Sequence, residues 1–191
     1  MNTEQNIYFQ EIFTGLSLAN ETFKSMVFED CQFNDSSFID CRFENCKFIH
    51  CKYNECVLSA INPLNCRFTE VEFIKCKVIG FDWTQTQQIK TLDFTKCQIN
   101  YSNFSFLKIP MIRIFKCEAI EVDFTEADLN HGDFQYTDFE KSIFFKTNLS
   151  CTNFQQAKNY LIDVRNNTLK KARFSLPEAL SLLFSLDIVI D

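Results

Sequence analysis

Ten cysteines are the residues of this 191-residue chain with the clearest potential to bind a metal or to react. Four of them recur singly at intervals of five residues, at Cys41, Cys46, Cys51 and Cys56. Zinc sites instead group cysteine pairs within compact knuckles. The regular spacing therefore indicates that these cysteines are small, inert packing residues and not metal ligands.

Catalytic machinery has little support in the sequence. The chain has 2 histidines, His50 and His131, and 3 glycines. It therefore offers no glycine-rich loop for phosphate, and no nucleophile, base and orienting group form a recognisable set. We predict that the protein is not an enzyme, has no catalytic residue, metal or cofactor, and carries both histidines as solvated surface groups.

Phenylalanine accounts for 23 residues and sets the dominant pattern. Large apolar residues stand at every fifth position in two runs, and one extra residue separates the runs between Trp83 and Phe94. The first run includes Phe23, Phe28, Phe33, Phe38, Phe43, Phe48, Tyr53 and Leu58, and the second includes Phe124, Leu129, Phe134, Phe139, Phe144, Leu149 and Phe154. We call each of these residues a frame centre, position i. Position i−2 is mostly small or apolar and holds nine of the ten cysteines.

A period of five fits neither the 3.6 residues of a helix turn nor the alternation of a strand. One large and one small inward residue in every five suit a coil that turns a corner after each unit, with four units in one turn. Residues twenty apart would then be stacked, as Cys31 is under Cys51. Oxidation of such a pair is geometrically feasible, but a narrow interior favours packing. Positions i−1, i+1 and i+2 are predicted to face solvent.

Units such as Ala127-Asp128-Leu129, Gly132-Asp133-Phe134 and Thr137-Asp138-Phe139 resemble the repeat of the pentapeptide-repeat family. The resemblance implies an all-β fold, a right-handed quadrilateral parallel β-helix. At four units per turn it has about seven coils. We expect it to occupy residues 1–158 and to be interrupted near 84–91, where the extra residue bulges out as a short loop.

Residues 159–191 lose the frame and form the second predicted unit. An irregular connector leads to Ser175-Leu176-Pro177-Glu178, which reads as a capping box at the start of a short C-terminal α-helix. A terminal strand follows. This segment is too apolar for one rod end to cover, so we expect a homodimer through the C-terminus. The dimerisation candidates are Leu180, Leu183, Phe184, Ile188 and Ile190.

A rod of this length, interrupted near its middle and closed by such a cap, resembles the quinolone-resistance (Qnr-type) and microcin-immunity branch of the family. The resemblance implies a non-enzymatic, dimeric mimic of DNA. Such a protein binds a type II topoisomerase, either DNA gyrase or topoisomerase IV, and protects it from quinolone or peptide-toxin poisoning. The alternative is a scaffold that presents its surface to a different protein partner.

The candidate partner-binding residues come from the interruptions and from the acidic i−1 positions of the second run. They are Gln87, Lys90, Arg113, Phe115, Asp123, Asp128, Asp133 and Asp138. Two interpretations of the charges stay open, a solvated coat that blocks edge pairing and an acidic rod that occupies a DNA-binding groove.

The net charge of −6 argues against direct nucleic-acid binding and against attraction to an anionic membrane surface. Residues 1–10 show no basic stretch followed by an apolar one, as a secretion signal would. We therefore expect a cytoplasmic protein.

Overall fold

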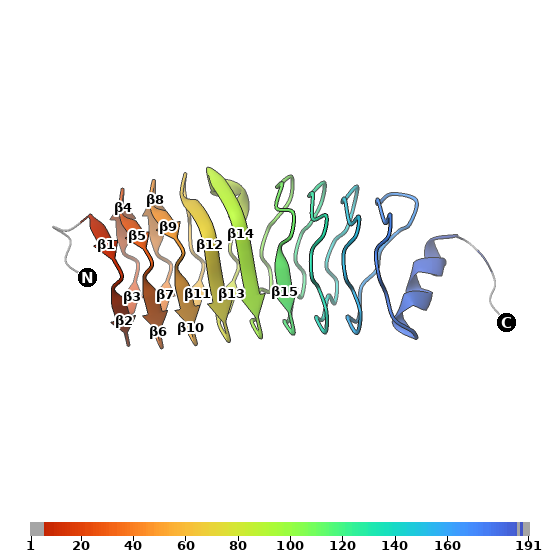
Figure 1. Cartoon of the computed structure of the whole chain (residues 1–191), viewed down its shortest axis with the longest axis horizontal. Helices are drawn as coiled ribbons and strands as arrows, with labels where there is room; N and C mark the ends of the chain where they lie inside the picture. Colours follow the sequence, from red (N-terminus) through yellow and green to blue (C-terminus); the bar gives the residue numbers. More distant parts are fainter. Residues whose placement is uncertain (1–5, 187, 189–191) are drawn as a thin grey trace.

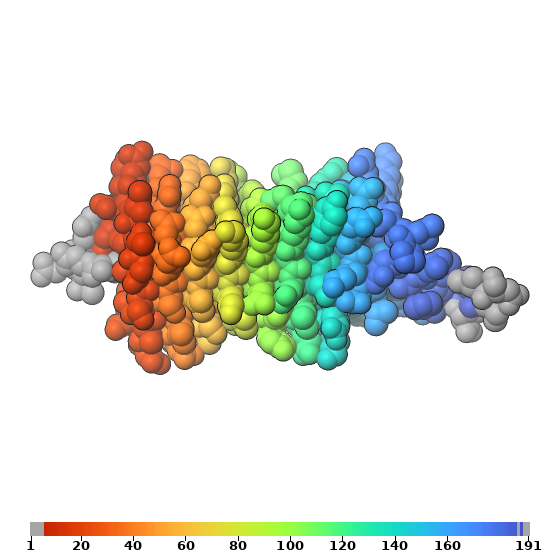
Figure 2. Space-filling model, turned by 90° about the horizontal axis from the view of Figure 1, so that it is seen from below, coloured from red at the N-terminus to blue at the C-terminus, as the bar shows by residue number. Residues whose placement is uncertain are grey.

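The computed structural model describes residues 6–186 and 188, and these form a straight rod of stacked coils with a short helix at its C-terminal end (Figure 1). The strands are β1 (Ile7–Phe9), β2 (Ile12–Thr14), β3 (Ser17–Ala19), β4 (Thr22–Lys24), β5 (Val27–Glu29), β6 (Gln32–Asn34), β7 (Ser37–Ile39), β8 (Arg42–Glu44), β9 (Lys47–Ile49), β10 (Lys52–Asn54), β11 (Val57–Ser59), β12 (Arg67–Ile74), β13 (Lys77–Ile79), β14 (Gln88–Thr95) and β15 (Arg113–Phe115). Two 3-10 helices complete the elements, η1 (Trp83–Gln85) and η2 (Glu178–Leu186). Space-filling atoms show the coils as successive bands along the rod (Figure 2).

Every strand pairs in parallel with the strand one coil away, and the register of the pairing gives the number of residues in one coil. Partners are twenty residues apart, as in Tyr8 with Phe28. Between β12 and β14 the offset becomes twenty-one, with Phe68 opposite Ile89. The predicted four-sided β-helix with one inserted residue is therefore confirmed.

Aromatic frame centres stack in columns along the interior. Ring centroids of Phe28 and Phe48 are 5.2 Å apart with an interplanar angle of 6°, and those of Phe33 and Tyr53 are 4.6 Å apart. Rings of neighbouring columns meet edge to face, as Phe28 and Phe33 do at 5.5 Å and 67°. Both arrangements are favourable for aromatic quadrupoles. The core is thus an ordered lattice of rings.

Position i+2 turns each corner with a left-handed backbone. Across the described chain, positive φ angles recur at this position, for example 54° at Asp30, 56° at Lys96 and 59° at Tyr136. Gly80 adopts φ 64° with open space around its Cα, so only the backbone favours glycine there. This requirement for a left-handed residue is absent from the sequence analysis, although Asn, Asp and Gly are frequent at i+2 and give its signal.

The interruption is shorter than the predicted loop at 84–91. The extra residue is absorbed by η1, where Asp82 Oδ1 accepts from Thr84 N at 3.1 Å and Thr86 Oγ1 donates to the Trp83 carbonyl at 2.7 Å. Strand β14 then resumes pairing at Gln88. The frame centre of this side is Ile89, because insertion before it moves the frame by one residue.

The coil continues beyond the predicted boundary at residue 158. Asn153 forms a parallel bridge with Arg173, and Phe174 stacks on Phe154 at 5.2 Å. The segment predicted as an irregular connector therefore forms most of another coil. It was missed because its spacing contracts, so that Phe144 lies opposite Ile162.

The predicted C-terminal α-helix is a 3-10 helix, η2. Its predicted capping box is also wrong, because the two side chains bond the coil beneath. Ser175 Oγ accepts from Gln156 N at 2.8 Å, and Glu178 Oε1 accepts from Asn159 N at 2.6 Å. These bonds attach the helix to the end of the rod. The predicted terminal strand lies largely outside the described residues.

A matched pair of phenylalanines tests the ring columns. Phe104 is fully buried (0% exposed), whereas Phe106, two residues later, is 67% exposed. We predict that Phe104→Ala lowers the free energy of unfolding by about 3–5 kcal/mol, because it removes a ring from the stack and leaves a cavity. Phe106→Ala should change it by less than about 0.5 kcal/mol. Urea denaturation followed by circular dichroism measures both. Equal losses would show that burial of the frame centres is not what stabilises the rod.

Candidate protein-binding surface

The interior of the rod is closed to ligands. The space between the aromatic columns, lined by residues such as Phe28, Phe48 and Phe68, is about 10 Å³, which is room for one water at most. Contacts with other molecules must therefore come from the outward positions.

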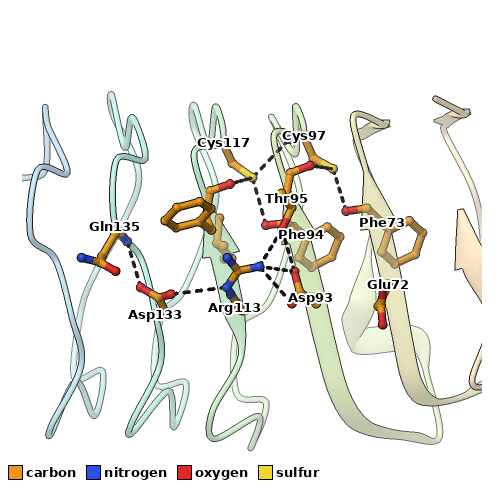
Figure 3. Close-up of polar contacts among 12 residues, drawn as sticks. Glu72, Phe73, Asp93, Phe94, Thr95, Cys97, Arg113, Cys117, Asp133 and Gln135 are labelled. Carbon is orange, nitrogen blue, oxygen red and sulfur yellow. Dashed lines mark hydrogen bonds and ion pairs between the residues drawn. The ribbon is translucent and has the colours of Figure 1, made fainter. Parts of the chain in front are cut away.

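The cysteines at i−2 are buried and hydrogen-bonded. Cys97 Sγ donates to the Phe73 carbonyl at 3.2 Å, and Cys117 Sγ donates to the Phe94 carbonyl at 3.3 Å (Figure 3). Burial raises the pKa of the Cys51 thiol to about 12, so it remains protonated at neutral pH. The structure thus places these thiols as fillers that also satisfy backbone carbonyls.

The four aspartates predicted to bind a partner lie on four different sides of the rod. Asp123 bridges to Asn103, Asp128 to Lys108, Asp133 to Arg113 and Asp138 to Glu118, so each belongs to its own ladder. Successive units face successive sides, so residues five apart in sequence cannot form one flat patch. Instead they form an acidic belt: residues 117–140 include Glu118, Glu121, Asp123, Glu126, Asp128, Asp133, Asp138 and Glu140 and no lysine or arginine.

These aspartates also have a local structural role. Asp123 Oδ1 accepts from Thr125 N at 2.8 Å, and Asp133 Oδ1 accepts from Gln135 N at 3.3 Å. Asn148 and Asn153 repeat the arrangement with Ser150 N and Gln155 N. Such Asx turns satisfy a backbone donor within one unit. Many C-terminal sides are accordingly reduced to a single bridge and a turn in place of a three-residue strand.

Three of the predicted residues meet at Arg113 in β15. Its Nη1 donates to Asp93 Oδ1 and Oδ2, both at 3.1 Å, and its Nε lies 3.4 Å from Asp133 Oδ2 (Figure 3). Its Cζ is 4.4 Å from the ring centroid of Phe115. The arginine therefore ties three successive coils together and is already occupied by protein groups. All three charged side chains are partly exposed, and ion pairs that water can reach contribute little each.

The remaining predicted residues, Gln87 and Lys90, lie on the side that precedes Arg113. Gln87 Oε1 accepts from Arg67 Nε at 2.8 Å, and Lys90 is in register with Thr69. The predicted partner-binding set consequently surrounds the rod and does not form one site.

Sequence reasoning missed a group of exposed apolar residues on the coil that follows β14. Tyr101, Phe106 and Met111 stand at three successive corners with φ of 61°, 62° and 61°. All three side chains are mostly exposed. Their signal was readable, because bulky apolar residues at i+2 are unfavourable both for the backbone and for hydration.

The C-terminal end is apolar and partly open. In a 3-10 helix, with three residues per turn, Leu180, Leu183 and Leu186 align on one line of η2. Phe184 (74% exposed) lines a groove of about 250 Å³ with Leu161. The predicted residue Ile188 is also exposed, whereas Ile190 lies outside the described residues. Leu186, which the α-helical spacing left out, belongs to this surface.

Two polar groups distinguish the coil beneath the helix. The buried Tyr160 hydroxyl has no hydrogen-bond partner among the described residues, and burial raises its pKa to about 12. Hydrogen bonds from Arg165 hold the pKa of the Asp163 carboxyl at about 2.

No helix in the described part of the chain has the length and apolar composition needed to cross a membrane.

Comparisons with known proteins agree with this architecture. The family described as pentapeptide repeats matches residues 123–158 with 8 copies. No curated protein sequence matches the chain significantly. A trypsin-treated variant of QnrB1, a plasmid-mediated fluoroquinolone resistance protein, has a TM-score of 0.70 at 18% identity, covering 97% of this chain and 98% of its own. A second trypsin-treated QnrB1 variant has a TM-score of 0.68 at 18% identity, covering 94% and 100%.

The five-residue frame and the four-sided coil are those of the pentapeptide-repeat fold, and residues 123–158 match the pentapeptide repeats themselves. The fold of the chain resembles that of QnrB1 over nearly the full length of both chains.

Two substitutions of Asp123 distinguish the effect of its charge from its role as the acceptor of the Asx turn. Asp123→Ala should lower the free energy of unfolding by about 1 kcal/mol, because Thr125 N loses its acceptor. Asp123→Asn keeps an acceptor oxygen and should stay within about 0.5 kcal/mol of the parent protein. Urea denaturation of the three proteins is the measurement. If alanine and asparagine have the same effect, the Asx turn is not the reason for the aspartate.

Proposed function

We propose that this chain is a non-enzymatic homodimer that binds a type II topoisomerase, DNA gyrase or topoisomerase IV, and relieves its poisoning by quinolones or peptide toxins. The observation that carries the proposal is the resemblance of the fold to QnrB1 along 97% of the chain. Binding occurs through the outside of the rod, since its interior is packed.

The acidic belt at residues 117–140 supports the DNA-mimicking part of the proposal. Its carboxylates are distributed around the rod, as phosphates surround a duplex. Neighbouring coils compensate some of them, with Lys141 Nζ 3.5 Å from Glu121 and Lys146 Nζ 3.4 Å from Glu126. Asp123 and Asp128 have no ion pair among the described residues and are the strongest candidates to meet a basic DNA-binding groove.

A titration with DNA gyrase tests this function. Full-length protein should restore supercoiling in the presence of a fluoroquinolone and reduce drug-stabilised cleavage complexes at micromolar concentration. The variant Asp123→Asn/Asp128→Asn removes two charges and retains an acceptor at both turns, so it should protect more weakly at unchanged melting temperature. The proposal fails if tens of micromolar protein leave both supercoiling and cleavage unchanged with gyrase and with topoisomerase IV.

Dimerisation through the C-terminal end is the second part of the proposal. The exposed side chains of Leu180, Phe184 and Leu186 support a self-complementary apolar contact that leaves no edge for further growth.

We predict that Phe184→Asp yields a folded monomer, because an unpaired carboxylate in an apolar interface costs several kcal/mol. Light scattering coupled to size exclusion measures the mass, and Phe106→Asp, at an equally exposed phenylalanine on the rod, is the control that should remain a dimer. A wild-type protein that is monomeric at micromolar concentration would contradict the prediction.

A scaffold for a different protein partner is the second candidate function, and the apolar corners at Tyr101, Phe106 and Met111 favour it. Recovery of a single partner other than a topoisomerase, lost in Phe106→Asp, would support the scaffold.

A further inference from the structure

Three lysines are stacked along one corner of the rod. Lys75, Lys96 and Lys116 occupy position i+2 in three consecutive coils, with φ of 53°, 56° and 55°. Backbone hydrogen bonds connect these coils, from Lys75 N to the Thr95 carbonyl and from Lys96 N to the Phe115 carbonyl, both at 2.9 Å. Neighbouring coils are about 4.8 Å apart, so the three ammonium groups start from closely spaced backbone positions.

Charges at the other corners are arranged differently. Glu121 pairs with Lys141 and Glu126 with Lys146, so successive coils carry opposite signs. Within the described residues, no other outward column stacks three like charges in consecutive coils. Lys75 pairs with Glu55 at 2.6 Å, whereas Lys96 has no carboxylate within ion-pair distance among the described residues. The lysine column therefore carries positive charge at Lys96 and Lys116 that no carboxylate among the described residues pairs with.

A groove of about 440 Å³ runs beside these lysines. Its other lining residues include Lys77 and Lys158 on the next side, the carboxylates Glu118 and Asp138, and a floor that contains Cys97. The lining thus carries five lysines against two carboxylates. Lys158 lies 3.1 Å from Asp138, which leaves most of the uncompensated charge at the lysine column.

One of the lysines is held in place by aromatic rings. Lys116 Nζ lies 5.1 Å from the ring centroid of Phe115 and 5.3 Å from that of Tyr136. Cation–π contacts orient an ammonium group without neutralising its charge. Lys116 is therefore positioned to attract an anion at the end of the groove.

We propose that this lysine groove, formed by Lys75, Lys77, Lys96, Lys116 and Lys158, binds an extended acidic segment of a partner protein. Alternate side chains of an extended peptide lie on one side of its backbone, about 6.6 Å apart. The lysine side chains extend over three coils of the rod and are flexible, so they can contact two such carboxylates of the peptide. The groove is a surface separate from the acidic belt, and its occupant does not depend on the topoisomerase proposal.

A nucleic acid fits the groove less well than an acidic peptide does. The chain has a net charge of −6, and Asp35 and Glu55 precede Lys75 in the same corner column. A duplex would extend its phosphates over these two carboxylates, whereas a short peptide can stay beside the lysines.

Fluorescence anisotropy with fluorescein-labelled hexaglutamate tests the groove in the full-length protein. We expect Lys96→Gln/Lys116→Gln to weaken binding by about tenfold or more, since both unpaired charges are lost. The control, Lys141→Gln/Lys146→Gln, removes the same charge from two other corners and should change affinity by less than about twofold. Lys96→Arg/Lys116→Arg should retain binding, and the affinity of the parent protein should fall as sodium chloride is added.

Three results would overturn the proposal. The first is no binding of hexaglutamate at about 1 mM protein in low salt. The second is equal weakening by the groove variant and its control, which would reduce the effect to net charge. The third is tighter binding of a single-stranded or duplex oligonucleotide than of hexaglutamate, which would make the groove a nucleic-acid site.

Discussion

The distance between neighbouring strands of a parallel sheet, about 4.8 Å, is the constraint on which this structure depends. Offset aromatic rings stack favourably at nearly the same distance. The Phe33 and Tyr53 centroids at 4.6 Å and the Phe28 and Phe48 centroids at 5.2 Å show both repeats in register. The backbone ladder and the ring columns can therefore extend together without distortion. An extra residue fits neither repeat, which is why it leaves the ladder in η1 and pairing resumes only at Gln88.

The inward positions were predictable because burial demands one residue type at a fixed interval. The regular spacing of Phe and Cys predicts the coil in this way. The pairing of residues twenty apart follows from four units of five residues per coil. The left-handed backbone at the corners was less evident, since position i+2 favours Asn, Asp or Gly without requiring them. The aspartates at 123, 128, 133 and 138 were named as one set of candidates, and each unit turns its aspartate to a different side. The cap was misread because Ser175 and Glu178 serve a capping box and a bond to the underlying coil equally well in sequence.

The acidic i−1 residues illustrate how structure and function overlap at one position. Asp123 and Asp133 satisfy the backbone at their own turns, so their presence alone is no evidence for a basic partner. Asparagine performs the same task at 148 and 153 without charge. What the turn leaves undetermined is the choice of aspartate over asparagine. That choice supplies four of the eight carboxylates in residues 117–140 of a chain whose net charge is only −6. The turns need an acceptor oxygen but no negative charge. The negative charge of these aspartates is therefore the feature of the acidic belt that indicates a partner.

The same reasoning applies with more force to the corners. Position i+2 imposes a left-handed backbone, which disfavours bulky side chains, and solvent disfavours apolar ones. Phe106 and Met111 violate both preferences, and the lysine column at 75, 96 and 116 adds repulsion between like charges. Their backbones turn the corners, but the side chains of neither group pack in the core. Side chains that oppose the local preference and contribute nothing to the core are best explained by a contact outside the coil. The backbone geometry is the same at every corner of the repeat, so the residue types at the corners can be compared directly. Corners whose residues differ from the favoured types mark the surfaces that other molecules contact.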